Sequence, residues 1–306
     1  MITPKNIVKL FWYRLRSNLT SNQVTKTDYD RKFWFSYLKN FVSDINLQSK
    51  PKGDFEVIDV LIPAVERDLN TLKYAIQSLK KFSCNPINQI YIVAPDSEKI
   101  SDFAQQNGCI YVKDQAINNI KKNDIKYSVD GLDRSGWLFQ QLVKLSWTDI
   151  SSAEYCLIFD ADTMILRDQV FVTNQRKLVL NCSDEYHTPY YAVFKKLLKR
   201  DVDFPLSFVS HYMIFERGTT IELQKRLDEL NNTTWIKAIL NHCDYNSHSG
   251  FSEYELYGHY MYLYHRNSII VNYWYNQLLT RKEFERKDEF FDASKYKSAS
   301  CHWYNS

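Results

Sequence analysis

The sequence predicts an α/β fold in which a mostly parallel, twisted sheet is flanked by helices and preceded by a helical extension. Two observations predict it. Runs of β-branched residues alternate with segments of helical period between residues 57 and 112, which is typical of βαβ units. The cluster Lys50-Pro51-Lys52-Gly53 separates this region from the residues before it. We therefore expect an N-terminal helical extension over residues 1–53 and one main domain over residues 54–306.

The extension begins with the pattern of a basic amphipathic helix at residues 4–19. Ile7 and Phe11 belong to its apolar stripe, and lysine and arginine side chains lie on the other side. The stripe has two interpretations. It docks on the chain's own domain, as apolar stripes usually do, or it lies on an anionic membrane surface. Residues 20–54 are polar, with a helical segment at 33–45.

The main domain then alternates strands and helices. Its first half is expected to contain strands at 57–62, 89–94, 109–112 and 154–159, and helices at 69–82, 97–106 and 137–147. Pro63 and Pro95 end the first two strands, and a polar loop fills 113–133. The second half is less regular, and its expected elements are strands at 208–215 and 268–274 and helices at 220–230 and 235–240.

Three Asp-x-Asp triplets occur, beginning at Asp28, Asp160 and Asp201, and their context distinguishes them. The first lies in the polar extension and the third in a basic loop. Only Asp160 and Asp162 directly follow a buried strand, at the sheet edge where α/β folds bind ligands. Paired carboxylates there suit Mg²⁺ or Mn²⁺ bound to a diphosphate. The alternative is a structural turn.

In this respect the chain resembles the GT-A-fold glycosyltransferases, which transfer a sugar from a nucleotide-sugar donor. The resemblance covers roughly residues 55–275. It rests on VIDVLIPA at 57–64, IYIVAPD at 90–96, RSGWLFQQLVKL at 134–145, IFDAD at 158–162 and FSEYELYG at 251–258. The chain looks most like a poorly characterised bacterial branch associated with surface polysaccharide synthesis. The resemblance implies a GT-A-like catalytic domain, a saccharide or glycolipid acceptor and a divalent metal.

The resemblance also implies roles for individual residues. Asp160 and Asp162 match the pair that holds the metal and the diphosphate and ribose of the sugar donor. Four further residues occupy the nucleotide side of the cleft by position: Pro63, Ala64, Glu66 and Asp96.

The segment after residue 134 has a physical logic of its own. On a helix, Trp137, Gln141 and Lys144 share one face and can point together into a cleft. Arg134 or Lys144 could neutralise charge on a diphosphate leaving group. The alternative is an amphipathic helix whose leucines pack inward and whose polar groups are solvated.

Two glutamates are candidates for the general base. Glu253 and Glu255 come where inverting members of the similar fold carry an acidic residue that deprotonates the acceptor. We favour Glu253, because Ser252 suits a helix N-cap and would fix Glu253 in the first turn. Tyr254 interrupts the familiar acidic pair, so an inverting outcome is only weakly favoured, and both glutamates could instead be surface charges.

Two histidines are relevant to the site. Several branches of the similar fold complete the metal shell with a His near the C-terminus, and His302 is the candidate here. His211 falls within the expected strand at 208–215 and is interpreted as a core side chain whose hydrogen bonds are satisfied.

Composition excludes several other classes. A net charge of +3 predicts no nucleic-acid partner. Six cysteines without a C-x-x-C pair predict neither a zinc clip nor a disulfide framework. Because no apolar run approaches a membrane span, we expect a cytoplasmic protein, with or without peripheral contact at the inner face of the membrane through residues 4–19. The sequence does not determine the oligomeric state.

Three other functions compete with sugar transfer. A haloacid-dehalogenase-type phosphatase also has D-x-D after a strand, but this chain lacks the later Asp-Asp pair. A sugar nucleotidyltransferase normally opens with a glycine-rich loop, and no glycine occurs here between Ile62 and Gly108. A non-enzymatic carbohydrate-binding protein would explain the 22 tyrosines but not the carboxylates at a strand end.

Overall fold

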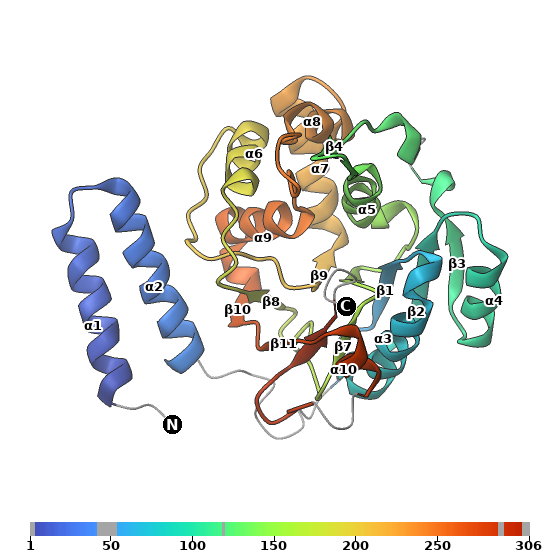
Figure 1. Cartoon of the computed structure of the whole chain (residues 1–306), viewed down its shortest axis with the longest axis horizontal. Coiled ribbons are helices and arrows are strands. Elements are labelled where there is room, and N and C mark those ends of the chain that lie inside the picture. Colours follow the sequence, from blue (N-terminus) through green and yellow to red (C-terminus); the bar gives the residue numbers. More distant parts are fainter. Residues whose placement is uncertain (1–3, 42–53, 118–119, 287–290, 302–306) are drawn as a thin grey trace.

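The computed structural model describes residues 4–41, 54–117, 120–286 and 291–301. Its centre is a five-stranded sheet of order β3-β2-β1-β6-β9, flanked by helices (Figure 1). The strands are β1 (Ile58–Pro63), β2 (Ile87–Ala94), β3 (Ile110–Lys113), β6 (Tyr155–Phe159) and β9 (Tyr212–Glu216). All neighbouring pairs are parallel except β6 and β9. The predicted α/β fold with a mostly parallel sheet is therefore confirmed.

The first half follows the sequence pattern closely. Helices α3 (Leu69–Phe82) and α4 (Glu98–Gln106) connect β1, β2 and β3. The apolar stripe of α3 is buried, and Ser97 caps α4 by accepting a hydrogen bond from the Ile100 amide. The expected loop contains a small hairpin of β4 (Ser128–Val129) and β5 (Leu132–Asp133). Helix α5 (Ser135–Leu145) then leads into β6.

The second half departs more from the prediction. Helices α7 (Arg217–Asn231) and α8 (Trp235–His242) and strand β10 (Ile269–Tyr273) lie where they were expected. Strand β8 (Leu178–Cys182) and helix α6 (Thr188–Leu198) were not predicted, and of helix α9 (Glu253–Tyr264) only the N-cap at Ser252 was. The strand expected at 208–215 is only β9, because His211 has a φ of 57°, a left-handed conformation that interrupts an extended chain.

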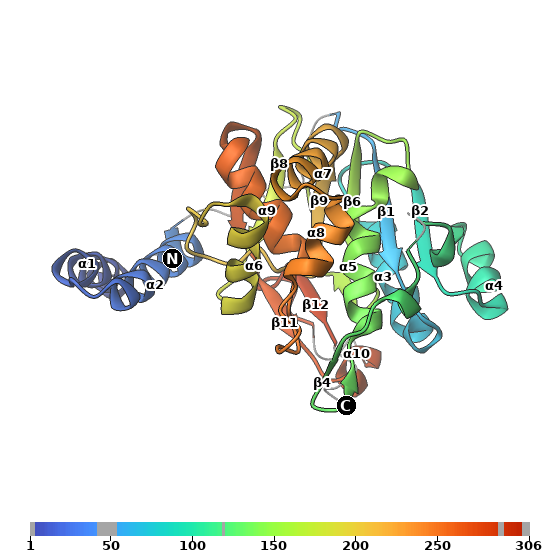
Figure 2. The same ribbon diagram turned by 90° about the horizontal axis from the view of Figure 1, so that it is seen from above.

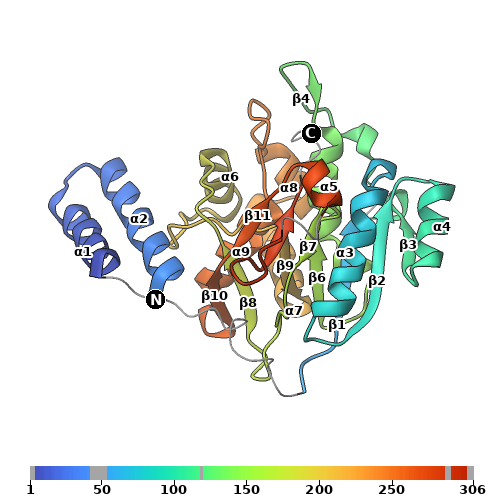
Figure 3. The same ribbon diagram turned by 60° about the horizontal axis from the view of Figure 1, so that its bottom comes forward.

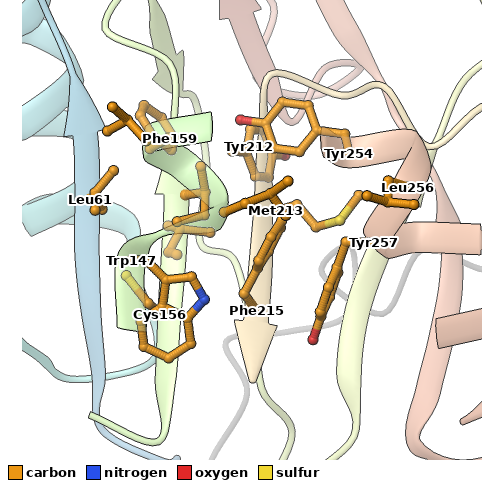
Figure 4. Close-up of a cluster of buried hydrophobic side chains, with 14 of the residues drawn as sticks. Leu61, Trp147, Cys156, Phe159, Tyr212, Met213, Phe215, Tyr254, Leu256 and Tyr257 are labelled. Atoms are coloured by element: carbon orange, nitrogen blue, oxygen red, sulfur yellow. The ribbon is translucent and has the colours of Figure 1, made fainter. Parts of the chain in front are cut away.

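Aromatic side chains fill the space between the sheet and α9. Figure 4 shows Phe215 of β9 and Tyr257 of α9 with their rings stacked, and the ring centroids are 3.9 Å apart. The Tyr257 hydroxyl accepts a hydrogen bond from the Glu216 amide, so the ring is buried without leaving its polar end unpaired. This contact fixes α9 against the antiparallel edge of the central sheet.

A second small sheet joins distant parts of the chain. Its order is β11-β12-β7, with β7 (Thr163–Ile165), β11 (Asn276–Leu278) and β12 (Ser298–Ser300). The short helix α10 (Arg281–Glu285) lies between β11 and β12 in the chain. Because β7 begins one residue after Asp162, this sheet brings the last described residues to the end of β6.

The N-terminal residues form a helical hairpin. Helices α1 (Pro4–Leu19) and α2 (Gln23–Phe41) pack together and project from the main body, with α1 on the outer side (Figures 1, 2 and 3). The helix predicted at 33–45 thus begins ten residues earlier, and residues 42–45 lie outside the described part of the chain. Among the described residues, no helix has both the length and the apolar character needed to cross a membrane.

The contact between α9 and Phe208 gives a prediction about stability. A Cβ atom at Gly258 would lie 2.4 Å from Cγ of the buried Phe208 side chain. We expect Gly258→Ala to lower the thermal midpoint, because overpacking costs about 1–3 kcal/mol and the gain in helix propensity is about 1 kcal/mol. Gly218→Ala in α7 is the matched control, since its Cβ would meet no atom within 4 Å. Equal midpoints for the two variants would contradict this packing.

Candidate active site

The candidate site lies where the parallel strands of the central sheet end. β1 and β6 are parallel neighbours, so the chain after Phe159 emerges beside the loop that follows Pro63. The Asp160 amide donates a hydrogen bond to the His211 carbonyl at 2.9 Å, and the Thr163 amide donates to the Asp160 carbonyl at 3.2 Å. The turn that carries Asp160 and Asp162 is therefore held by the residue that precedes β9 and by the first residue of β7.

Lys144 of α5 connects this turn to α9. Its Nζ lies 2.6 Å from Asp160 Oδ1 and 2.8 Å from Glu253 Oε1. The lysine and the glutamate are buried, whereas the Asp160 side chain is 25% exposed. Ser252 accepts a hydrogen bond from the Glu255 amide, which confirms the predicted N-cap and fixes Glu253 at the first position of α9. Three predicted site residues from three elements are thus in direct contact.

Tyr254 adds a fourth side chain to this cluster. Its hydroxyl donates a hydrogen bond to Asp160 Oδ1 at 3.1 Å, and Lys144 Nζ lies 4.5 Å from the centre of its ring. Burial, together with the charges of Asp160 and Glu253, raises the pKa of Tyr254 well above its ordinary value. The phenol therefore stays protonated at neutral pH and keeps its hydrogen bond to the aspartate.

The charges in this cluster do not cancel. Burial acts to lower the pKa of Lys144, but Asp160 and Glu253 outweigh burial and raise it, so the lysine is charged. Burial raises the pKa of Glu253, with Lys144 opposing and Asp160 reinforcing that shift. One ammonium faces two carboxylates, which leaves a net negative charge when both carboxylates are ionised. Glu253 Oε2 is buried without a hydrogen-bond partner in the described structure.

Asp68 is a site residue that the sequence analysis missed. It follows β1, and its Oδ2 accepts a hydrogen bond from the Val65 amide at 2.9 Å. Burial raises the pKa of Asp68, and the negative charge of Asp162 contributes in the same direction. Arg281 of α10 interacts with the same carboxylate. The sequence did offer a signal for Asp68, because this carboxylate comes five residues after the end of β1, the strand beside β6.

The C-terminal strand reaches the same turn. β12 pairs antiparallel with β7, and the Cys301 amide donates a hydrogen bond to the Asp162 carbonyl at 3.0 Å. Ser300 Oγ lies 2.7 Å from His211 Nδ1. His211 is thus a buried, hydrogen-bonded side chain, as the sequence indicated, although it does not lie within a strand. The predicted ligand His302 follows directly and lies outside the described residues.

The residues assigned to the nucleotide side do not share one cluster. Pro63 and Ala64 are buried at the end of β1, where the Ala64 amide donates to the Val93 carbonyl. Glu66 is exposed and bound to Lys99 at 3.0 Å, and Asp96 is exposed and bound to Lys113 at 2.8 Å. These two carboxylates therefore already have surface partners.

The predicted face of α5 is divided between two environments. Arg134 donates a hydrogen bond to the His248 carbonyl at 2.7 Å and stacks over the Trp137 ring at 4.8 Å. Gln141 is buried and donates to the Trp137 carbonyl at 3.2 Å. Of the residues predicted on this face, only Lys144 touches the carboxylates after β6 in the described contacts.

Glu255 belongs to a different cluster from Glu253. Its carboxylate accepts hydrogen bonds from the Phe208 amide at 2.9 Å and the Tyr191 hydroxyl at 3.1 Å, and His259 Nε2 lies 3.1 Å away. Glu255 is buried, so neither glutamate is the surface charge that the alternative interpretation proposed. Its contacts tie α9 to the loop before β9.

The chemistry of the available ligands suits a hard divalent cation. Carboxylate oxygens are the ligands that Mg²⁺ and Mn²⁺ prefer, and the Asp160 side chain is 25% exposed although it is bound to Lys144. Within the described ranges, however, no group of three or more His, Cys, Asp or Glu side chains could hold a metal. A metal here would need oxygens from a substrate or a ligand from outside these ranges.

Comparisons with known proteins give a family and two structural likenesses. Residues 56–299 match the model of a family of unknown function (DUF6492). None of the curated proteins matches the chain. The structure is similar to mouse xyloside xylosyltransferase 1 in its apo form, with 10% identity, 82% of this chain and 99% of that chain covered, and a TM-score of 0.45.

A second likeness is to glucosyl-3-phosphoglycerate synthase from Mycobacterium tuberculosis, in complex with Mn²⁺, uridine diphosphate and glucosyl-3-phosphoglycerate. The identity is 15%, the alignment covers 36% of this chain and 34% of that chain, and the TM-score is 0.25.

Proposed function

The chain belongs to the DUF6492 family, whose function is unknown, and we propose that it is a metal-dependent glycosyltransferase that uses a nucleotide-sugar donor. One observation carries the proposal. Two aspartates follow the buried strand β6 at the carboxyl edge of a parallel sheet, where α/β folds bind nucleotides, and a buried lysine holds the first of them. Residues 54–306 would form the catalytic domain.

Asp160 and Asp162 would hold Mn²⁺ or Mg²⁺, and His302 is the proposed further ligand. A bound divalent cation would supply positive charge to the diphosphate of the sugar donor. Lys144 and Tyr254 keep Asp160 in place through contacts of 2.6 and 3.1 Å. Their role in this proposal is to position the aspartate, so that it does not reorganise when the substrate binds.

The role of Glu253 follows from its surroundings. Its side chain is only 1% exposed and is paired with Lys144, so an acceptor hydroxyl has no direct access to it in the described conformation. These contacts support a positioning role for Glu253 through Lys144. The general-base role remains a prediction, and with it the inverting outcome, which the anomeric configuration of the product would test by NMR.

The acceptor is proposed to be a saccharide or glycolipid, as the resemblance to glycosyltransferases of surface polysaccharide synthesis implies. The phosphatase alternative would act on a different substrate. It would release inorganic phosphate from a phosphate monoester, such as a sugar phosphate, whereas sugar transfer or slow hydrolysis of a nucleotide sugar releases a nucleoside diphosphate. Assaying both kinds of substrate and identifying the product of each separates the two functions.

Ligand binding tests the proposal without an acceptor. We expect a nucleoside diphosphate to raise the thermal midpoint only when Mn²⁺ is present. At a hundred times its dissociation constant a ligand stabilises the native state by about 2.7 kcal/mol, which corresponds to roughly 4 °C for a protein of this size. Differential scanning fluorimetry with UDP, GDP, ADP, CDP and dTDP, each with Mn²⁺ or EDTA, measures this shift.

The matching nucleosides without phosphate serve as controls, because they cannot bridge to a metal. A shift that is equal with Mn²⁺ and with EDTA would contradict the metal-dependent part of the proposal. The absence of a shift with every nucleotide would contradict the use of a nucleotide-sugar donor.

A further inference from the structure

The outer surface of α1 is apolar and uncovered. Six large apolar side chains on this helix are at least 43% exposed, and Phe11 and Leu19 reach 73%. These residues, called the α1 apolar face below, are Ile7, Val8, Phe11, Trp12, Leu15 and Leu19. At 100° per residue they occupy a continuous arc of about 140°. Such a stripe normally faces a protein core.

Helix α1 instead turns mainly polar groups toward α2. Ser17 is 1% exposed and donates a hydrogen bond to Asp30 at 2.6 Å, and Asn6 donates to Asn40 at 3.2 Å. Arg14 reaches Asp30 as well, at 3.3 Å. Trp12, at the margin of the α1 apolar face, contacts Tyr29 of α2 with ring centroids 5.6 Å apart, whereas the other five members are 45–73% exposed. The interpretation that the stripe docks on the chain's own domain is therefore wrong for this arrangement.

Helix α2 attaches the hairpin to the main body. The ring of Phe35 lies 5.4 Å from that of Tyr273 in β10, and Trp34 lies 6.2 Å from Phe204. The Tyr275 hydroxyl donates a hydrogen bond to the Lys39 carbonyl at 2.6 Å. With α2 held on the body, α1 lies on the side of the hairpin away from it in every view (Figures 1, 2 and 3).

Positive charge borders the α1 apolar face. The helix contains no acidic residue and four basic ones. Lys5, Lys9 and Arg16 follow one edge of the arc, and Arg14 lies at the other. At the edge that carries Lys5, Lys9 and Arg16, the Arg16 guanidinium lies 5.3 Å from the centre of the Trp12 ring. An apolar strip bordered by cations, with a tryptophan at its margin, matches the layers of an anionic lipid surface.

We propose that α1 lies in the plane of an anionic membrane, with its apolar face among the acyl chains and its basic edges at the lipid headgroups. The short apolar face and the few charges give weak, reversible attachment that salt reverses. This inference stands independently of the proposed function. Combined with it, the attachment would hold the catalytic domain beside lipid-linked acceptors.

Flotation with vesicles tests the inference on the full-length protein. We expect the protein to float with vesicles of phosphatidylcholine and phosphatidylglycerol at low salt, and to remain at the bottom with phosphatidylcholine alone. Raising the salt to 1 M should release it, because the Debye length falls from about 10 Å at 0.1 M to about 3 Å.

Two kinds of variant separate the contributions of the apolar and the charged side chains to vesicle binding. Phe11→Ser should lower the partition coefficient by about tenfold or more, because a large apolar side chain is lost from the lipid. Lys5→Gln with Lys9→Gln should lower it by about fivefold for each charge, and only with the anionic vesicles. Val57→Ser is the matched control, since Val57 is 54% exposed and lies outside the hairpin, and it should float like the parent.

Two results would overturn the inference. One is flotation of Phe11→Ser equal to that of the parent protein. The other is a failure of the parent to float, together with a dimer in sedimentation velocity that Phe11→Ser dissociates, which would assign the α1 apolar face to self-association. Neither result depends on activity, so both are distinct from a failure of the proposed glycosyltransferase function.

Discussion

Replacing Asp162 with Asn is expected to abolish sugar transfer while leaving the fold intact. The side chain is partly exposed at the turn after β6, so the substitution removes a charge from the site and leaves the core packing unchanged. Losing a metal-binding carboxylate costs several kcal/mol in the transition state, which corresponds to about 10³-fold or more in rate. The rate of nucleoside diphosphate release and the thermal midpoint without ligand measure the two parts of this prediction.

Asp201→Asn is the matched control for this experiment. Asp201 also belongs to an Asp-x-Asp triplet, but it is exposed and pairs with Lys195 at 2.9 Å. We expect the control to keep its activity. If Asp162→Asn retained normal, metal-dependent activity, the carboxylate pair after β6 would not be the metal site.

Glu253→Gln is expected to lower kcat by about 10²- to 10⁴-fold, and its effect on metal binding identifies the role of Glu253. In a positioning role, Glu253 balances the charge of Lys144. Its removal leaves that lysine free to compete with a cation for Asp160, so Mn²⁺ affinity should fall by at least about tenfold. In a general-base role, Mn²⁺ affinity would stay unchanged. Calorimetric titration with Mn²⁺ measures the difference, and the contacts favour the first result.

The pH dependence of metal binding follows from the charge of the Glu253 carboxylate. The pKa of Glu253 lies above its ordinary value, so this carboxylate gains a proton as the pH falls through the raised pKa. Below that pH the parent protein resembles Glu253→Gln, and above it the extra negative charge favours a cation. Mn²⁺ affinity should therefore rise with pH through this range in the parent and change less in the variant.

Glu255→Gln provides the matched control for burial. Glu255 is equally buried and only two residues away, but it contacts Phe208 and Tyr191 and makes no described contact with Asp160. We expect this variant to be less stable and to keep the Mn²⁺ affinity of the parent. A comparable loss of affinity in both variants would show that disturbing α9, and not the charge at Lys144, is responsible.

Where local pattern decides the structure, the sequence was sufficient. Strands β1, β2 and β6 are mostly apolar runs ended by proline or aspartate, and α3 has one clear apolar stripe, so composition, period and terminators locate each of them. Helix α9 was only suspected from Ser252, because its residues Glu253 to Met261 are all buried and a helix buried on every side shows no stripe. Strands β7 and β12 each have three residues, too few for any period to appear.

In the candidate site, too, local pattern identified single residues but not the contacts between them. Asp160 was found because it follows a strand, and Lys144 because helical spacing places it on a face. The contact between Lys144 and Glu253 spans 109 residues of sequence, and only the resemblance suggested that these residues belong together with Asp160. Tyr254 was interpreted as an interruption of an acidic pair, whereas its hydroxyl binds Asp160. The role of a hydroxyl depends on where its helix lies, and spacing alone does not determine that.

The pairing of β7 with β12 sets an order of events during translation. Ser298 to Ser300 lie far along the sequence from β7, yet they pair with this strand, which directly follows Asp162. At 5–20 residues per second, about 135 residues must still be synthesised after Ile165 before its partner exists, which takes roughly 7–27 s. The central sheet can form on the ribosome in that time, but β7 remains unpaired. The nascent chain therefore acquires its fold first, and the turn that carries Asp160 and Asp162 takes its final form only after residues 298–300 have been synthesised.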